Sequence, residues 1–182
     1  MNNSFIEQIF LHYKRIWKFE YYQIYQLTNG PMRILFKEFS ILVIPPYNDR
    51  NMWTYATLGM SLDSSLGMEL HMFSKFENKK LIEILTAIAY YHMTEKTLSL
   101  NDTVNFGIPW QEGSQCDYGL ISLPYLDGSD LENLGDNIKF YWLIPITEAE
   151  RNYRWHYGVE KLEQLFEDKN FNYLDFYRYS VV

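Results

Sequence analysis

Histidines, one cysteine and scattered carboxylates are the residues of this chain whose types could carry chemistry. Glu69 and His71 lie two positions apart in a strand-like stretch, so their side chains share a face and could hold a metal ion with a remote third ligand. A cross-strand polar pair is the alternative, and we expect no metal site. His92 falls on the apolar stripe of a predicted helix, where we expect a core histidine bonded to a backbone carbonyl.

Cys116 is the single cysteine of the chain, so no intramolecular disulfide can form and a reducing cytosol is the expected compartment. A nucleophilic thiolate needs a nearby cation or helix N-terminus, whereas the neighbouring Asp117 would raise the thiol pKa. We therefore expect a buried, inert thiol. Phosphate-binding, metalloprotease and nucleophile-elbow motifs are missing from the sequence. We predict a chain that is not an enzyme and holds no cofactor, with an enzyme using Cys116, His71 or His92 as an alternative.

Two segments carry residues that suit contacts with another protein. Trp110 lies in a loop containing glycine and proline, where an aromatic side chain can serve as a contact or as a lid over the core. A second segment follows a strand end and combines an aromatic residue with carboxylates; a solvated acidic turn is its alternative role. The predicted partner-binding residues are Trp110, Tyr125, Asp127, Asp130 and Glu132.

The charge of the chain is negative and unevenly distributed. The net charge is −7, and residues 102–182 carry 14 acidic against six basic side chains. Phosphate contacts require lysine and arginine, so we expect no nucleic-acid partner. An acidic face also repels membrane surfaces and attracts basic proteins, although maintaining solubility is the alternative explanation. The longest aliphatic run, at residues 41–44, is far shorter than a membrane span, and we expect a cytoplasmic protein without a membrane partner.

Hydrophobic periodicity predicts the elements that must position these residues. Helical spacing covers residues 4–18 and 79–93, and Thr147 with Glu150 has the capping-box spacing of a third helix, which Gly158 interrupts. Near-continuous apolar strands at 119–123 and 140–144 are expected in the centre of a sheet, each leaving it at the following proline. Residues 99–118 are expected to form a long, structured loop.

Further strand-like stretches occur around residues 20–27, 34–36, 39–44, 52–58 and 68–73, with a turn at 29–31 and a polar loop at 63–67. Hydrophobic residues make up 47% of the 182 residues, enough for a sizeable core. Repeats and convincing linkers are missing. The sequence therefore predicts one α+β domain over residues 1–182, with a mixed β-sheet and helices packed on it.

Several long segments of the chain are similar to those of a known family. They are Trp53–Ser61, Glu69–Ser74, Leu85–His92, Asp102–Trp110, Leu120–Tyr125, Trp142–Arg151 and Arg178–Val182. In this order they resemble the segments of the Suppressor of fused-like domain family. The resemblance spans residues 53–182, and before residue 53 only the order of elements fits. The resemblance implies an α/β-type domain with a mixed central sheet, and it brings no catalytic motif.

The resemblance also implies a function in protein binding. Animal members are two-domain cytoplasmic regulators of Hedgehog signalling that sequester transcription factors, and this chain resembles their N-terminal domain alone. Single-domain bacterial relatives imply an immunity protein that neutralises a toxin of a polymorphic toxin system. The acidic charge agrees with this, because many toxin effectors are basic nucleases. A regulatory scaffold that sequesters another endogenous protein is the alternative.

Overall fold

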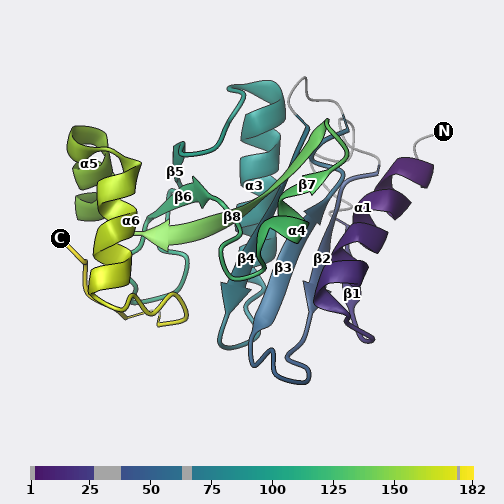
Figure 1. Cartoon of the computed structure of the whole chain (residues 1–182), viewed down its shortest axis with the longest axis horizontal. Helices are drawn as coiled ribbons and strands as arrows, with labels where there is room; N and C mark the ends of the chain where they lie inside the picture. The colour runs from purple at the N-terminus through teal and green to yellow at the C-terminus, as the bar shows by residue number, and fades with distance from the viewer. Residues whose placement is uncertain (1–2, 27–37, 63–66, 176) are drawn as a thin grey trace.

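A single mixed sheet with helices on both faces organises the chain (Figure 1). The computed structural model describes residues 3–26, 38–62, 67–175 and 177–182. The helices are α1 (Asn3–Trp17), α3 (Lys80–Thr94), α4 (Ser129–Glu132), α5 (Glu148–Tyr157) and α6 (Val159–Asp168). The strands are β1 (Gln23–Tyr25), β2 (Ser40–Ile44), β3 (Trp53–Leu58), β4 (Gly67–Ser74), β5 (Thr103–Asn105), β6 (Tyr118–Ser122), β7 (Asn133–Leu134) and β8 (Ile138–Ile146).

The strand order is β1-β2-β3-β4-β8-β6-β5, and β7 pairs with the beginning of β8. Only β4 and β8 run parallel among the described pairs, so the sheet is mixed, as predicted. β6 and β8 each have a neighbour on both sides, which confirms the central position expected from their unbroken apolarity. The α+β fold class predicted from the sequence is thus confirmed, while the domain limits 1–182 stay a prediction.

The two faces of the sheet are covered by different helices (Figure 1). Alternation along β4 sends Met68, Leu70 and Met72 to the face covered by α3. The opposite face is covered by α1 at one end, and by α6 with the C-terminal segment at the other. Between α1 and α6, residues 123–128 cross this second face, which we call the front face.

The start of α5 is fixed as predicted. Glu150 N donates to Thr147 Oγ1 at 3.2 Å, and Thr147 N donates to Glu150 Oε2 at 2.8 Å, which completes a capping box. Gly158 separates α5 from α6 with φ 92°, a conformation that favours glycine. Helices at 4–18 and 79–93 are confirmed within one or two residues.

Two local predictions are wrong. The loop expected at 99–118 contains a strand, because β5 pairs with β6 through residues 103–105. Pro145 does not end its strand, since β8 continues to Ile146. The pairing of β8 with β4 ends at Trp142. Pro145 therefore has no paired strand on the β4 side, and its missing N–H costs no hydrogen bond there. The turn at 29–31, the stretch 34–36 and most of the loop at 63–67 lie outside the described residues.

Candidate functional site

The acidic segment after β6 forms a tight turn on the front face. Pro124 O accepts hydrogen bonds from Asp127 N at 2.9 Å and Gly128 N at 3.0 Å. The turn lifts Tyr125 and Leu126 into solvent, where they are 58% and 45% exposed. The result is a hydrogen-bonded tip that presents an aromatic and an aliphatic side chain.

Asp127 points inward and anchors this turn. Its Oδ1 atom accepts a hydrogen bond from Arg50 Nη1 at 2.7 Å, and its side chain is 2% exposed. The guanidinium of Arg50 lies 5.2 Å from the centroid of the Trp17 ring and 5.0 Å from that of Phe73. An arginine held between two rings in this way is fixed by cation–π attraction as well as by its ion pair. The turn is thereby tied to α1, to the loop before β3 and to β4.

His71 lies beside the ion pair. Its Nε2 atom is 3.6 Å from Asp127 Oδ2, too far for a direct hydrogen bond. Burial lowers the pKa of His71 to about 4; Asp127 opposes this shift, and Arg50 adds to it. His71 is therefore neutral at pH 7. The ion pair beneath the turn is formed by Arg50 and Asp127.

The predicted contact residues fall into two groups. Tyr125 and Asp130 are exposed and Glu132 is half-buried, so these three can meet a partner. Trp110 is 1% exposed and donates from its indole nitrogen to Ser114 Oγ at 3.0 Å. It has the position of the lid over the core that was its alternative role. Asp127 is buried in an ion pair with Arg50 and is not a solvent-exposed charge. Partner binding by the five residues stays a prediction, with Trp110 and Asp127 acting from beneath the surface.

The residues considered for catalysis are enclosed. Cys116 is buried, and burial raises the pKa of its thiol, with Asp117 as a smaller cause in the same direction. His92 Nδ1 accepts from the backbone N–H of Leu98 at 2.9 Å. The described residues contain no group of three or more His, Cys, Asp or Glu that could hold a metal ion. Their helices include none long and apolar enough to cross a membrane.

Glu69 is enclosed by hydrogen-bond donors rather than paired with His71. Its carboxylate accepts from Ser61 N at 3.1 Å, Ser61 Oγ at 2.7 Å and Thr57 Oγ1 at 2.5 Å. Gly59 N and Met60 N also donate to it, at 3.1 and 3.4 Å. Burial raises its pKa to about 7, and the bonds from Ser61 and Thr57 oppose that rise. Glu69 thus fastens the segment after β3 to β4.

A groove lies between α3 and β5, which is the last strand at its end of the sheet. The groove has a volume of about 490 Å³, with apolar walls from both elements and with Glu95 and Lys96 also in its lining. Its apolar lining includes Ile84, Ala87, Ile88, Tyr91, Val104 and Phe106. The sequence does not indicate this site, because three strand residues within a loop give little pattern. The alternation of Thr103, Val104 and Asn105 was the signal available.

The backbone of β5 presents hydrogen-bonding groups at the open edge. Ile121 N donates to Asp102 O and Phe106 N donates to Asp117 O, so residues 102 and 106 face β6. In an antiparallel pair the direction alternates, which turns the N–H and C=O groups of Thr103 and Asn105 away from β6. Within the described part of the chain, no strand pairs with that side. An edge of this kind can accept an extended segment of another protein.

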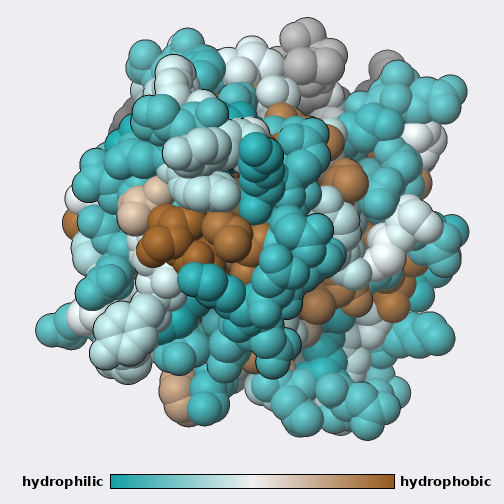
Figure 2. Space-filling view, turned by 60° about the vertical axis from the view of Figure 1, so that its left-hand side comes forward, coloured by the Kyte–Doolittle hydropathy of each residue, from teal (hydrophilic) through white to brown (hydrophobic). Residues whose placement is uncertain are grey.

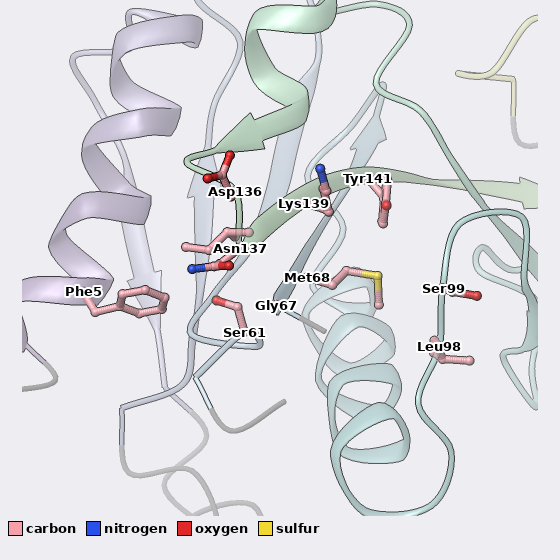
Figure 3. Close-up of a pocket in the computed structure, with 11 residues that line it drawn as sticks. Phe5, Ser61, Gly67, Met68, Leu98, Ser99, Asp136, Asn137, Lys139 and Tyr141 are labelled. Carbon is pink, nitrogen blue, oxygen red and sulfur yellow. The ribbon is translucent and has the colours of Figure 1, made fainter. Parts of the chain in front are cut away.

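A second cavity opens where the parallel strands β4 and β8 begin (Figure 3). Its volume is about 510 Å³, and its lining mixes Phe5 and Met68 with Ser61, Asn137 and Lys139. Lys139 Nζ already donates to Asn133 Oδ1 at 2.6 Å. Among the described residues, the cavity combines apolar and polar walls, and the charged residues of its lining are Asp136 and Lys139.

The side of the molecule with α5 and α6 comes forward in Figure 2. A compact hydrophobic patch lies near the middle of this face, surrounded by hydrophilic residues. Large apolar side chains are also exposed on α5 and the C-terminal segment, where Trp155 is 74% and Tyr179 is 84% exposed. Isolated exposed aromatics are common, but aromatic side chains are also frequent anchors of protein interfaces.

Comparison with known proteins identifies the fold and the family. A SUFU homolog from Neisseria gonorrhoeae FA 1090 has 33% identity and a TM-score of 0.90, covering 98% of this chain and 97% of that chain. A structure of a Sufu–Fu complex has 13% identity and a TM-score of 0.66, covering 98% of this chain and 91% of that chain. Drosophila Suppressor of Fused has 14% identity and a TM-score of 0.55, covering 79% of this chain and 42% of that chain.

A search of curated protein sequences finds no significant match. The profile of the Suppressor of fused protein (SUFU) family matches residues 37–179, most of the chain. The TM-scores show that the fold described above is shared with these solved structures. The chain therefore belongs to the Suppressor of fused protein (SUFU) family.

Proposed function

We propose that this chain is a non-catalytic protein-binding module, and that it acts as an immunity-type protein that binds and neutralises a toxin effector. A family relative was solved as a Sufu–Fu complex, which supports the protein-binding part. The enclosed positions of Cys116, His71 and His92 agree with a role other than catalysis. Contact with a partner needs exposed groups instead. The surface offers two sets of them: the open edge of β5 with its groove, and a group of exposed carboxylates.

The observation that carries the proposal is the open edge of β5 beside its groove. Outward N–H and C=O groups of Thr103 and Asn105 can pair with an extended segment of a partner. The apolar groove between α3 and β5 is suited to bury alternate side chains of that segment. Main-chain bonds would supply affinity, and the shape of the groove would supply selectivity.

The charge of the surface favours a basic partner. Asp130 is exposed just after the front-face turn, Asp136 is exposed between β7 and β8, and Glu160, Glu167 and Asp168 are exposed on α6. These carboxylates would accelerate association with a basic domain, and the effect should weaken as salt screens them. A nuclease-type effector has the matching charge. We place Tyr125, Asp130 and Glu132 at this contact, with Asp127 supporting the turn from below; Trp110 is buried on the α3 side of the sheet and would support the surface there.

A matched pair of variants tests the edge. Thr103→Pro removes one outward N–H without touching a bond to β6, whereas Thr103→Ala keeps the N–H and loses the side chain. Tagged wild type, Thr103→Pro and Thr103→Ala are used to capture partners from the source cells, with quantitative mass spectrometry of the eluates. We expect a stoichiometric basic partner with wild type and Thr103→Ala, and at least a tenfold loss with Thr103→Pro. Equal recovery with both variants would refute binding at the edge.

The immunity role needs a separate test. The captured partner is expressed with and without this chain, and growth of the host is measured. We expect toxicity that coexpression relieves. A captured partner that is harmless would refute the toxin assignment and favour a scaffold that sequesters an endogenous protein.

Charge reversal then tests the acidic contact in the purified pair. Asp130→Lys combined with Glu132→Lys is expected to slow association at low salt and to flatten its salt dependence. Both side chains reach solvent, so the fold should tolerate the exchange. Association rates equal to wild type at low salt would remove the acidic turn from the interface.

A further inference from the structure

A group of polar side chains meets beneath the front-face turn without completing its hydrogen bonds. We call Arg50, His71 and Asp127 the polar junction; the ring of Trp17 lies against it, 5.6 Å from the His71 ring centroid. These residues come from the loop before β3, from β4, from the turn and from α1. Their side chains are 16%, 0% and 2% exposed for Arg50, His71 and Asp127.

The unpartnered atoms of the junction include both donors and acceptors. Arg50 Nη2, both ring nitrogens of His71 and Asp127 Oδ2 are buried and make no hydrogen bond to protein. Neutral imidazole supplies one donor and one acceptor, guanidinium supplies donors, and carboxylate supplies an acceptor. Buried polar groups without a protein partner are commonly satisfied by an ordered internal molecule.

Charge and spacing restrict what that molecule can be. Arg50 and Asp127 cancel each other, so a cation would be repelled by the guanidinium and an anion by the carboxylate. The occupant must instead be neutral and able to donate and accept at once. The 3.6 Å between His71 Nε2 and Asp127 Oδ2 exceeds a hydrogen bond, which leaves both atoms available to a third group.

We propose that the polar junction is an internal water site. A water bound there donates to Asp127 Oδ2 or to the unprotonated nitrogen of His71, and accepts from Arg50 Nη2 or from the protonated nitrogen of His71. The hydrated junction ties the turn that carries Tyr125 and Leu126 to β4 and to the loop before β3. This site is independent of the proposed binding function, because it follows from the contacts beneath the turn.

The test is a high-resolution crystal structure of the full chain, with solution NMR as a second measurement. We expect density within about 2.6–3.2 Å of Asp127 Oδ2 and of one further junction atom. In solution, the ring protons of His71 should show cross-relaxation with a long-lived water. Glu69 is an internal control in the same map, because protein donors already surround its carboxylate and no water peak is expected there.

A variant and three contrary results sharpen the test. His71→Phe preserves a ring of similar volume and removes both nitrogens, so the water peak should be lost or displaced. Direct bonding of His71 to Asp127 with no peak would overturn the proposal, as would a peak with the scattering or short distances of a metal ion. If His71→Phe does not fold, the map and NMR spectra of the wild type decide alone, and absence of a water signal in both refutes the site.

Discussion

Removal of Arg178 should release the C-terminal segment from the body of the protein. Arg178 forms a two-pronged ion pair with Glu150, with Nη1 to Oε1 at 2.6 Å and Nη2 to Oε2 at 2.8 Å. Its Nη2 atom also donates to Pro145 O at 2.9 Å, and its guanidinium lies 4.5 Å from the centroid of the Phe171 ring. Glu150 Oε1 accepts in addition from Val181 N at 2.9 Å. One side chain thus connects α5, β8 and the tail.

The size of the effect follows from burial. The side chain of Glu150 is 0% exposed and that of Arg178 is 8% exposed, so Arg178→Leu leaves a carboxylate buried without its cation. Breaking such a pair from one side costs about 3–5 kcal/mol of unfolding free energy. For a domain of this size, each kcal/mol shifts Tm by about 2–4 °C, which predicts a fall of roughly 10 °C. Arg178→Lys keeps the charge but not the planar fork, and should cost less.

Urea unfolding followed by tryptophan fluorescence measures the free energy, and hydrogen exchange at the Val181 amide reports on the tail. Lys169→Leu is the matched control: it removes the same charge from an exposed side chain and should change stability by no more than about 0.5 kcal/mol. We expect Arg178→Leu to lower stability and to accelerate exchange at Val181. A loss below about 1 kcal/mol with an equally protected Val181 amide would refute the role of this ion pair in holding the tail.

Two further predictions concern the sheet. Gly119→Ala places a Cβ 2.6 Å from Leu143 Cδ1 and 2.7 Å from the Phe106 ring, so it should cost about 1–3 kcal/mol in urea unfolding, and a neutral result would contradict this close packing. The pKa of Glu69 is raised in the folded protein to about 7 from 4.5, so the stability that its protonated form contributes is fully present below pH 4.5 and is lost as pH rises to 7. The unfolding free energy of Glu69→Gln should therefore rise relative to that of wild type by up to about 3 kcal/mol across that range. A difference in unfolding free energy that does not change with pH would show that the hydrogen-bond donors hold the pKa of Glu69 near its ordinary value.

The sequence was most informative where local pattern and burial coincide. Thr147 and Glu150 predicted the start of α5 because a capping box is made within four residues, and the structure contains both of its hydrogen bonds. Alternation in β4 correctly put Glu69 and His71 on one face. Unbroken apolarity correctly placed β8 in the centre of the sheet.

The sequence was least informative where a residue depends on a distant partner. An acidic turn was one of the roles considered for the segment that contains Asp127, but the ion pair of Asp127 joins this turn to Arg50, 77 positions earlier in the chain. Strand β5 was missed because its three residues become a strand only through pairing with β6. The sequence left open whether Trp110 is a contact residue or a lid over the core. Its burial depends on segments that are distant in the chain, and the neighbouring proline and glycine do not reveal it.

The proposed function depends on binding of a partner at the edge of β5. Parallel capture with wild type, Thr103→Ala and Thr103→Pro, quantified by mass spectrometry, tests it most directly. We expect one stoichiometric basic protein that wild type and Thr103→Ala retain and whose recovery with Thr103→Pro falls by at least tenfold. Equal retention by Thr103→Pro, with its fold verified by circular dichroism and thermal unfolding, would contradict it.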